Sequence, residues 1–448
     1  MSVVVETPDG SHRLLAKGAP EEILRRCTRY EAGGGLHPVE PGLHDTLHEE
    51  YDALSADGFR VLAVASRQLG PEVACAGYSR TEEAELIFVG YLAFLDPPKE
   101  TAAPALEALR ASGVAVKVLT GDNALVTRKI CTHVGIAADR VMTGTEVERL
   151  DDAELREAVE HTTVFARLAP ADKPRVIRAL QQRGHVVGFL GDGINDALAL
   201  RAADVGLSVD TAVDVAKEAA DVILLEKSLL VLRDGVLEGR KVFSNVIKYV
   251  RMGASSNFGN MFSVLGASAW LPFVPMAPIQ VLTNNLLYDV SQVPIPTDNV
   301  DADQIAKPRP WAIGEIGRFI LLIGPLSSIF DYTTFLVMFF VFGARTPAHA
   351  ALFQTGWFVE SLMTQTLIVH VIRTNRIPFV QSRARWPLVA TTAAIMAIGA
   401  WLPFSPFAAA LGFVALPPLY WPVLLATLLS YLVLTTVVKR ALHRRGWI

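Results

Sequence analysis

The chain has 448 residues, a hydrophobic fraction of 51%, a charged fraction of 19% and a net charge of −4. This composition is typical of a membrane protein, the length exceeds one ordinary soluble domain, and the small net charge gives no indication of nucleic-acid binding. Three widely spaced cysteines, Cys27, Cys75 and Cys131, fit no metal-binding pattern and are expected to be reduced thiols.

The first segment, residues 1–90, is expected to mix short strands and helices. It begins with "MSVVVETPDG", which predicts a strand and a Pro-Asp-Gly turn, and "HRLLAKGA" predicts a second strand. No basic leader or long apolar run precedes them, so no signal peptide is expected and the chain opens inside a folded unit.

Residues 91–250 alternate apolar strands with amphipathic helices, which predicts a parallel sheet with helices on both faces. Three strands are expected to end at Asp96, at Thr120 and at Asp192. Ligands of such sheets bind beyond the carboxyl ends of the strands, so these polar residues are expected to meet at one edge.

The residues after those strands suit a phosphate and a metal ion. Clustered acids need a cation, and Mg²⁺ prefers carboxylate oxygens together with phosphate oxygens. Lys173, at the start of a helix, could neutralise phosphate, and the glycines around Asp192 let backbone N–H groups approach it. Each acid alone is equally well explained as a helix cap. The combination of 120–122, Lys173 and 191–196 favours a phosphate site.

A helix over 228–251 is expected to lead into six apolar stretches, each near the ~20 residues that cross a bilayer. The stretches are 252–271, 277–296, 319–342, 350–372, 386–404 and 419–438. Basic residues gather at one side of these spans, and the opposite side has one clear basic residue, Arg345. The first 250 residues and the C-terminus are therefore predicted to be cytoplasmic.

Polar side chains inside the spans are candidates for an ion path, because they are costly in lipid. Asn257 and Asn260 share a helix face on the first span, and Asn285 and Asp289 are four residues apart on the second. Glu360 is a further candidate. Asp331 is more readily explained as a structural acid that accepts hydrogen bonds between helices.

The motifs together resemble those of P-type ATPases, whose phosphorylation domain belongs to the haloacid-dehalogenase superfamily. The matching segments are "KGAPE" (17–21), "DPPKE" (96–100), "TGDN" (120–123), Lys173 and "GDGINDA" (191–197). The resemblance implies the fold class α/β plus all-α membrane. Its parts are a partial nucleotide-binding domain (1–90), a haloacid-dehalogenase-like, doubly wound parallel sheet (91–227), a stalk helix (228–251), a six-helix transmembrane bundle (252–438) and a basic tail (439–448).

The resemblance also implies site residues and cofactors. The expected cofactors are ATP and Mg²⁺, with Lys17 and Gly18 beside the nucleotide and Asp96 near the phosphoryl group. Thr120, Gly121, Asp122, Lys173 and Asn195 would act in catalysis, and Asp192 and Asp196 would bind Mg²⁺ at the phosphate.

The membrane half resembles that of magnesium-importing P-type ATPases of bacteria. "NNLLYDVSQVPIPTDN" and "ALFQTGWFVESLMTQTLIVHVIRT" are among the segments that carry this likeness. It implies a protein of the bacterial inner membrane whose partners are the lipid bilayer, ATP and a transported divalent cation. By position, Asn257, Asn260, Asn285, Asp289 and Glu360 are its candidate ligands.

One departure from the family pattern limits this interpretation. The family's nucleophile is the aspartate of a "DKTGT" segment, which does not occur in this sequence. The chain is therefore expected to be the C-terminal half of a pump, inactive alone and partnered by a separate N-terminal half. The alternatives are a non-catalytic membrane module that binds nucleotide or regulates a partner, and a phosphatase of the same superfamily with a membrane anchor.

Overall fold

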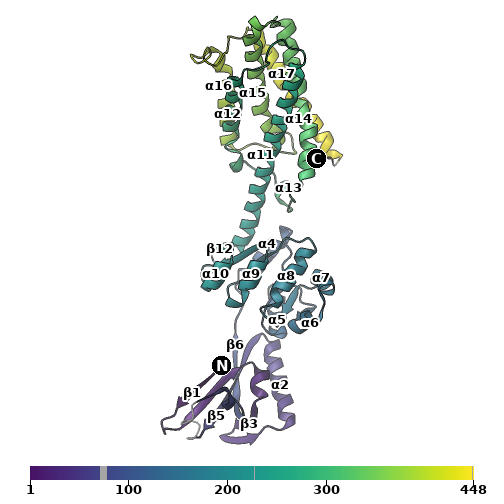
Figure 1. Ribbon diagram of the computed structural model, residues 1–448. Coiled ribbons are helices and arrows are strands. Elements are labelled where there is room, and N and C mark those ends of the chain that lie inside the picture. Colours follow the sequence, from purple (N-terminus) through teal and green to yellow (C-terminus); the bar gives the residue numbers. More distant parts are fainter. Residues whose placement is uncertain (71–77, 227, 446, 448) are drawn as a thin grey trace. The chain divides into compact units, whose positions relative to one another are not determined.

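The computed structural model describes residues 1–70, 78–226, 228–445 and 447, which form two compact units, Met1–Asp234 and Gly235–Ile448. The first unit contains all the β-strands and the second is helical (Figure 1). Cys27 and Cys131 are unpaired thiols, and Cys75 lies outside the described residues.

The first sheet has six strands in the order β1-β2-β5-β6-β3-β4. Their bounds are Ser2–Glu6, His12–Gly18, Phe59–Leu69, Leu86–Leu95, Cys27–Ala32 and Gly35–Pro38. Helices α1 (Pro20–Leu24) and α2 (Pro41–Ala56) both contact β5. The predicted opening hairpin is confirmed, because β1 pairs antiparallel with β2 and Gly10 has φ +78° in the turn.

The expectation for the strand that ends before Asp96 was wrong. β6 pairs with β5 and β3 in this first sheet, not with the strands that precede Thr120 and Asp192. An apolar run of this length is compatible with either sheet, so its sequence could not select the partner.

The remaining strands are short and parallel, and they form two three-stranded sheets where one doubly wound sheet was expected. One sheet is β7 (Val118–Leu119), β9 (Val164–Ala166) and β8 (Val141–Thr143); the other is β10 (Gly188–Leu190), β11 (Val205–Val209) and β12 (Val222–Leu224). Leu119 of β7 and Val187 pack against the same two hydrophobic clusters, so the two sheets share core contacts.

Helices alternate with these strands as the sequence predicted. They are α4 (Ala102–Ala111), α5 (Ala124–His133), α6 (Gly144–Arg149), α7 (Asp152–His161), α8 (Asp172–Gln182), α9 (Ala197–Ala202) and α10 (Asp214–Ala219). Helix α8 contributes Val176 to one of the two clusters and Ile177 to the other. This helix therefore stands between the two cores, with its N-terminus at the candidate site.

The second unit is built around α15 (Ala350–Ile372), which is buried along most of its length. The other long helices are α11 (Leu230–Ser268), α12 (Pro278–Gln292), α14 (Ile313–Leu336), α16 (Trp386–Trp401) and α17 (Tyr420–Arg444). Helix α15 contacts α12, α14, α16 and α17. Central placement explains why apolar side chains lie on all sides of α15 and why its polar side chains, such as Glu360 and Gln365, are buried as well.

Among the residues that the structure describes, three helical segments are long and apolar enough to cross a membrane: Ile313–Val341, Trp386–Phe404 and Tyr420–Arg444. They coincide with three of the six predicted spans. Helix α12 has 15 residues, which corresponds to about 22 Å and is shorter than a bilayer core of about 30 Å.

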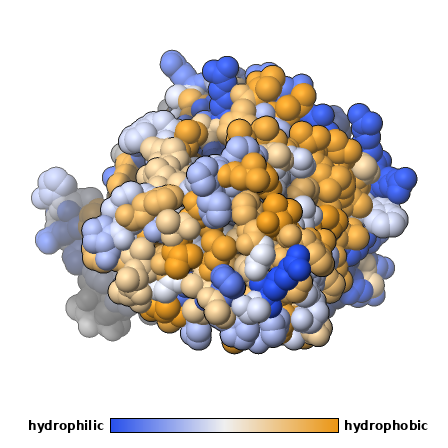
Figure 2. Space-filling view, turned by 90° about the horizontal axis from the view of Figure 1, so that it is seen from above, coloured by the Kyte–Doolittle hydropathy of each residue, from blue (hydrophilic) through white to orange (hydrophobic). Residues whose placement is uncertain are grey.

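Hydrophobic side chains cover much of the face of the second unit that Figure 2 presents. On α17 an exposed stripe repeats every four residues and comprises Leu425, Leu429, Val433 and Val437. A stripe at this spacing lies along one side of a helix, and such a large apolar surface is expected to meet lipid or another helix.

Candidate functional site

The loop after β7 is closed on itself by Thr120. Its Oγ1 donates to Asp122 Oδ2 over 3.1 Å and accepts from the Asp122 backbone N–H over 3.1 Å. A side chain on Gly121 would stand 3.5 Å from the Leu168 carbonyl oxygen. The predicted Thr-Gly-Asp triplet is thus a tight turn whose carboxylate is held near its own hydroxyl.

The segment that leads into α8 is bonded to this turn. The backbone N–H of Arg167 donates to the Asp122 carbonyl (2.9 Å), and that of Leu168 donates to the Thr120 carbonyl (3.0 Å). Arg167 has φ +52°, a left-handed conformation that is strained for a residue with a Cβ. These bonds fix the start of α8, and therefore Lys173, relative to the Thr120 turn.

Lys173 connects the turn to the loop after β10. Its Nζ lies 2.6 Å from Asp196 Oδ1, and the other oxygen of Asp196 accepts the Gly193 N–H over 3.1 Å. Gly191 makes room for this arrangement, because a Cβ there would come within 2.6 Å of Asp196 Cβ and 2.9 Å of Phe189. Glycine at 191 is therefore required by close packing behind the acid.

Asp192 and Asn195 lie in the same loop with exposed side chains. The predicted grouping of Thr120, Lys173 and Asp196 is consistent with these contacts, and Asp192 lies in the same loop as Asp196. A phosphate placed here would meet the Lys173 ammonium and exposed loop backbone, while Asp192 keeps both oxygens available.

The fit of these residues to Mg²⁺ follows from the donors they offer. Within the described ranges, no three His, Cys, Asp or Glu side chains gather closely enough to hold a metal ion by themselves. Mg²⁺ commonly uses one or two protein carboxylates and completes its shell with water and phosphate oxygens. Asp192 together with a phosphate fits that pattern. Asp196 could also bind the metal, but its negative charge is already shared with Lys173.

The expected nucleotide residues lie elsewhere in the first unit. Lys17 is exposed on β2, and a Cβ added to Gly18 would lie 3.5 Å from Ile23 of α1. Asp96 is exposed just after β6. In the part of the chain that the structure describes, no hydrogen bond or ion pair joins these three residues to Lys173 or Asp196.

Two contacts to the first sheet were not predicted. Arg167 forms an ion pair with Glu21 of the "KGAPE" segment (2.8 Å), and Asn123 donates to the Tyr51 hydroxyl of α2 (2.5 Å). Glu21 and Tyr51 lie on α1 and α2, the two helices that contact β5. Asn123, beside the Thr120 turn, and Arg167 are therefore bonded to the two helices that pack on the sheet carrying Lys17.

The polar residues of the helical unit fall into two groups. In the interior, Gln365 donates to Asn260 (3.1 Å) and to Ser361 (2.6 Å), and Asn284 donates to the same Ser361 (3.4 Å). Asn257, Asn285 and Asp289 are exposed in the described structure. Helix α12 turns Asn284 and Tyr288 inward instead, so only Asn260 of the four predicted amide and acid positions joins the interior network.

Two carboxyl groups are buried near this network. Asp331 accepts from Ser263 (2.7 Å) and from the Trp357 indole (2.8 Å), which supports the structural interpretation of this acid. Glu360 is 1% exposed, and neither of its carboxyl oxygens has a hydrogen-bond partner among the described residues. A buried, unsatisfied carboxyl group is costly, so Glu360 is the stronger candidate for an ion ligand.

A third acid, Asp298, was missed by sequence reasoning. It lies after α12 and accepts from Arg373 Nε (2.7 Å), Lys248 Nζ (3.1 Å) and the Arg385 backbone N–H (3.0 Å). Burial raises its pKa, but the hydrogen bond from Arg373 and the charge of Lys248 outweigh this and leave the pKa below its ordinary value. The available signal was an acid on the side of the spans that is rich in basic residues.

Comparisons with known proteins find matching families for parts of both units. A family described as "P-type ATPase, cytoplasmic domain N" matches residues 1–101, and one described as "Cation transporting ATPase, C-terminus" matches residues 273–441. The chain is 55% identical over all 448 residues to "Magnesium-transporting ATPase, P-type 1" of Salmonella typhimurium and 54% identical to the protein of that name in Escherichia coli. A "Calcium-transporting ATPase 1" of Bacillus cereus is 31% identical over 389 residues, 83% of this chain and 43% of that protein. The chain spans about half the length of these relatives, 49% of the Salmonella protein and 50% of the Escherichia coli protein.

Proposed function

This chain belongs to the P-type ATPase family, and from that premise we propose that it supplies the C-terminal half of an ATP-driven pump that imports Mg²⁺. The observation that carries the proposal is the ion pair between Lys173 and Asp196, in a loop cluster tied to the Thr120 turn. The pump would lie in the bacterial inner membrane with its first unit and C-terminus in the cytoplasm. The membrane half would be a bundle of six helices, of which three meet the length and hydropathy expected of a span.

The chain's own residues would act on the phosphoryl group of ATP in distinct ways. Lys173 would hold a phosphate oxygen, since its ammonium is already fixed at the loop edge by Asp196. Thr120 would bond the phosphate from the same side, and Asp122 would keep that hydroxyl oriented. Lys17 and Gly18 would border the nucleotide, with Asp96 at the hinge between the nucleotide and the phosphate.

Mg²⁺ at this site would be held by Asp192 and, once Lys173 turns to phosphate, by Asp196. Bound there, it would neutralise charge on the transferring phosphoryl group. Asn195 would bond the same loop. Asp192 and Asp196 would be engaged with the metal and Asn195 is not nucleophilic, so the nucleophile would be an aspartate of a "DKTGT" segment, which these 448 residues do not contain.

The transported ion would pass the polar interior of the second unit. Asn260 and Glu360 would take part from the interior, and Asn257, Asn285 and Asp289 from a face that is exposed in the described structure. One carboxylate with several amides makes a lightly charged site, which suits an ion that retains part of its water.

Phosphorylation tests the proposal directly. The chain alone, incubated with radiolabelled ATP and Mg²⁺, is expected to form no acid-stable phosphoprotein, whereas the chain joined to the N-terminal half of the Salmonella relative is expected to form one. Labelling of the chain alone would contradict the need for a second half. A chimera that folds and binds ATP but is never labelled would favour the alternative, a non-catalytic nucleotide-binding membrane module.

Transport by the same chimera tests the ion path. Asp289→Asn is expected to abolish Mg²⁺ uptake while leaving the protein folded, and Glu360→Gln is expected to reduce it. Full uptake by the Asp289→Asn chimera would remove Asp289 from the path without affecting the proposal for the phosphate site.

A further inference from the structure

The first unit consists of two parts that one short segment joins. The six-stranded sheet with α1 and α2 ends at Leu95, and the α/β region begins with α4. Residues 96–101 between them lie outside any helix or strand. A single irregular connection lets two bodies swing, so contacts between their side chains decide how the sheet that carries Lys17 lies against the turn at Thr120.

One such contact is the ion pair between Arg167 and Glu21, whose Nη2 and Oε1 atoms lie 2.8 Å apart. The Arg167 backbone is held to the turn, because its N–H donates to the Asp122 carbonyl (2.9 Å). Its φ of +52° is a strained conformation that surrounding contacts must maintain. Glu21 belongs to the segment that also contains Lys17 and Gly18. The pair therefore joins a residue fixed at the phosphate turn to the segment expected to border the nucleotide.

The second contact joins Asn123 to Tyr51 of α2, where α2 contacts α5 (Figure 1). Asn123 Nδ2 donates to the Tyr51 hydroxyl over 2.5 Å, and Asn123 Oδ1 accepts the Leu125 N–H over 2.8 Å at the start of α5. Both ends of this amide are thus engaged, and Tyr51 is buried. Burial and the negative charge of Glu21 raise the pKa of Tyr51. The charge of Glu21 acts on Tyr51 because the two contacts are neighbours in one patch.

We infer that Glu21 and Tyr51 are positioning residues, which hold the sheet that carries Lys17 at the Thr120 turn so that one ATP molecule reaches both. This inference rests on the proposed function. Fixing two binding surfaces relative to each other before a ligand arrives lowers the entropy that binding costs, so loss of the contacts should weaken ATP binding more than the chemical step. The side chains of Arg167 and Glu21 are 50% and 27% exposed, and such ion pairs add little to the free energy of unfolding. The pair can therefore open without unfolding the unit.

ATP hydrolysis by the chimera with the N-terminal half of the Salmonella relative tests this role. Glu21→Gln is expected to raise the KM for ATP about fivefold and to leave kcat within about twofold of the parent, as when an interaction stabilises the bound ground state and the transition state equally. Tyr51→Phe keeps the ring and removes the hydroxyl, and it is expected to raise the KM about threefold. A residue with a merely structural role would instead lower kcat through the amount of folded enzyme and leave the KM unchanged.

Glu22→Gln is the matched control, because Glu22 is the next residue of α1 and its ion pair, with Arg25 at 3.0 Å, stays within the same segment. Its KM for ATP is expected to equal that of the parent. Exchanging the charges, Glu21→Arg with Arg167→Glu, is expected to give a KM about fivefold below that of either reversal alone. Equal KM values for the two glutamine variants, or no recovery in the exchanged pair, would overturn the inference.

Hydrogen exchange by the 448-residue chain alone separates this inference from the proposed function. The amides of residues 120–125 and 167–169 are expected to exchange about two- to fivefold faster in Glu21→Gln than in Glu22→Gln, because the patch opens more often. Equal exchange in the two variants would show that the contact does not hold the two parts together, whatever the chimera does. A chimera that hydrolyses no ATP with either residue at 21, although exchange responds, would overturn the proposed function and the positioning role with it. An active chimera whose KM ignores Glu21 would overturn the positioning role alone.

Discussion

The first unit and the second each hold a shielded ion pair, and the two differ in what surrounds the acid. Lys173 and Asp196 have side chains that are 11% and 13% exposed, and exposed Asp192 and Asn195 lie in the same loop. The side chain of Asp298 is 0% exposed, and its oxygens accept hydrogen bonds from two cations and a backbone N–H. The first acid can exchange its partner for a ligand, whereas three donors already hold the second in place.

This difference in surroundings distinguishes a candidate ligand-binding site, at Asp196, from a structural ion-pair cluster, at Asp298. Burial disfavours both ions, but around Asp298 the loss of hydration is offset by three donors that come from α11, the end of α15 and the start of α16. Among the described residues, Asp196 forms an ion pair only with Lys173, and that cation is the residue expected to turn to phosphate. Substitutions that break the Asp298 ion pairs should therefore lower the stability of the second unit, whereas loss of the Lys173 ammonium should lower activity.

The largest effect is expected from Asp298→Ala. Removing this acid leaves Lys248 and Arg373 buried without a counter-charge, which should destabilise the second unit by about 3–5 kcal/mol. Thermal unfolding of the chain in detergent measures the loss. A variant that unfolds at the wild-type temperature would show that the Asp298 ion pairs do not stabilise the fold. Asp298 would then not differ from Asp196 in the way proposed.

Lys173→Met comes next and should act on activity. In a chimera with the N-terminal half of the relative, it should lower ATP hydrolysis about 10²–10³-fold, because it removes a fixed donor for phosphate charge. The unfolding temperature should stay near that of the unmodified chimera. Hydrolysis within twofold of the parent would mean that Lys173 is a structural residue like Lys248.

Gly191→Ala tests whether close backbone packing holds Asp196 in place beside Lys173. The added methyl would meet Asp196 Cβ at 2.6 Å, and relieving this contact should cost about 1–3 kcal/mol of stability and displace Asp196 from Lys173. Gly193→Ala is the matched control, because its Cβ would meet Asp196 Oδ2 at an ordinary 3.4 Å. Chemical unfolding and hydrolysis should both fall for the first variant, and equal behaviour of the two would refute the packing argument.

The smallest effect is expected from Asp303→Asn, which breaks the pair with Arg376. Both side chains are 49% exposed, so the change in unfolding free energy should lie within about 0–1 kcal/mol. The same thermal assay as for Asp298→Ala measures it. A loss as large as that of Asp298→Ala would imply that burial does not distinguish the two acids.

The sequence predicted the opening hairpin and the α/β alternation, because these depend on local patterns. It misplaced β6, since pairing is decided by distant strands. It also could not fix the rotation of α12: Asn284 and Asn285 are adjacent, and packing against α15 and α16 decides that Asn284 faces inward. Asp298 was missed because its partners lie 50 and 75 residues away.

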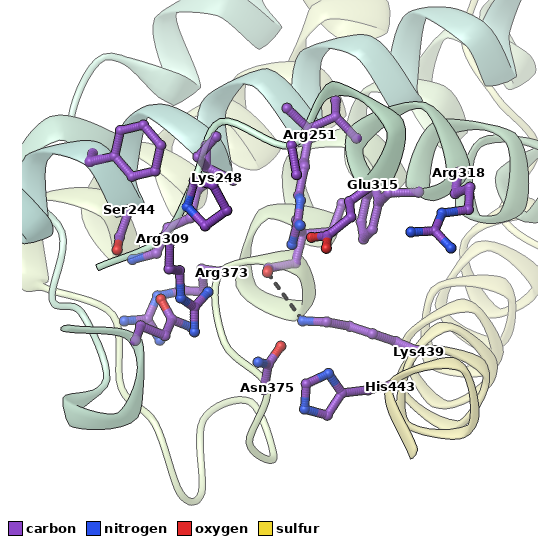
Figure 3. Close-up of a pocket in the computed structure, with 18 of the residues that line it drawn as sticks. Ser244, Lys248, Arg251, Arg309, Glu315, Arg318, Arg373, Asn375, Lys439 and His443 are labelled. Atoms are coloured by element: carbon purple, nitrogen blue, oxygen red, sulfur yellow. Dashed lines mark hydrogen bonds between the residues drawn. The ribbon is translucent and has the colours of Figure 1, made fainter. Parts of the chain in front are cut away.

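The three hydrogen bonds that Lys439 donates to carbonyl groups at and just after the end of α15 also restrict how α17 can move relative to α15 (Figure 3). One ammonium group on the last helix ties down the carbonyl end of the central helix, using every proton that it has. Sliding α17 along α15 would leave three acceptors without their donor at once. The two helices are therefore held together at this end by three hydrogen bonds, which would have to break before α17 could slide along α15.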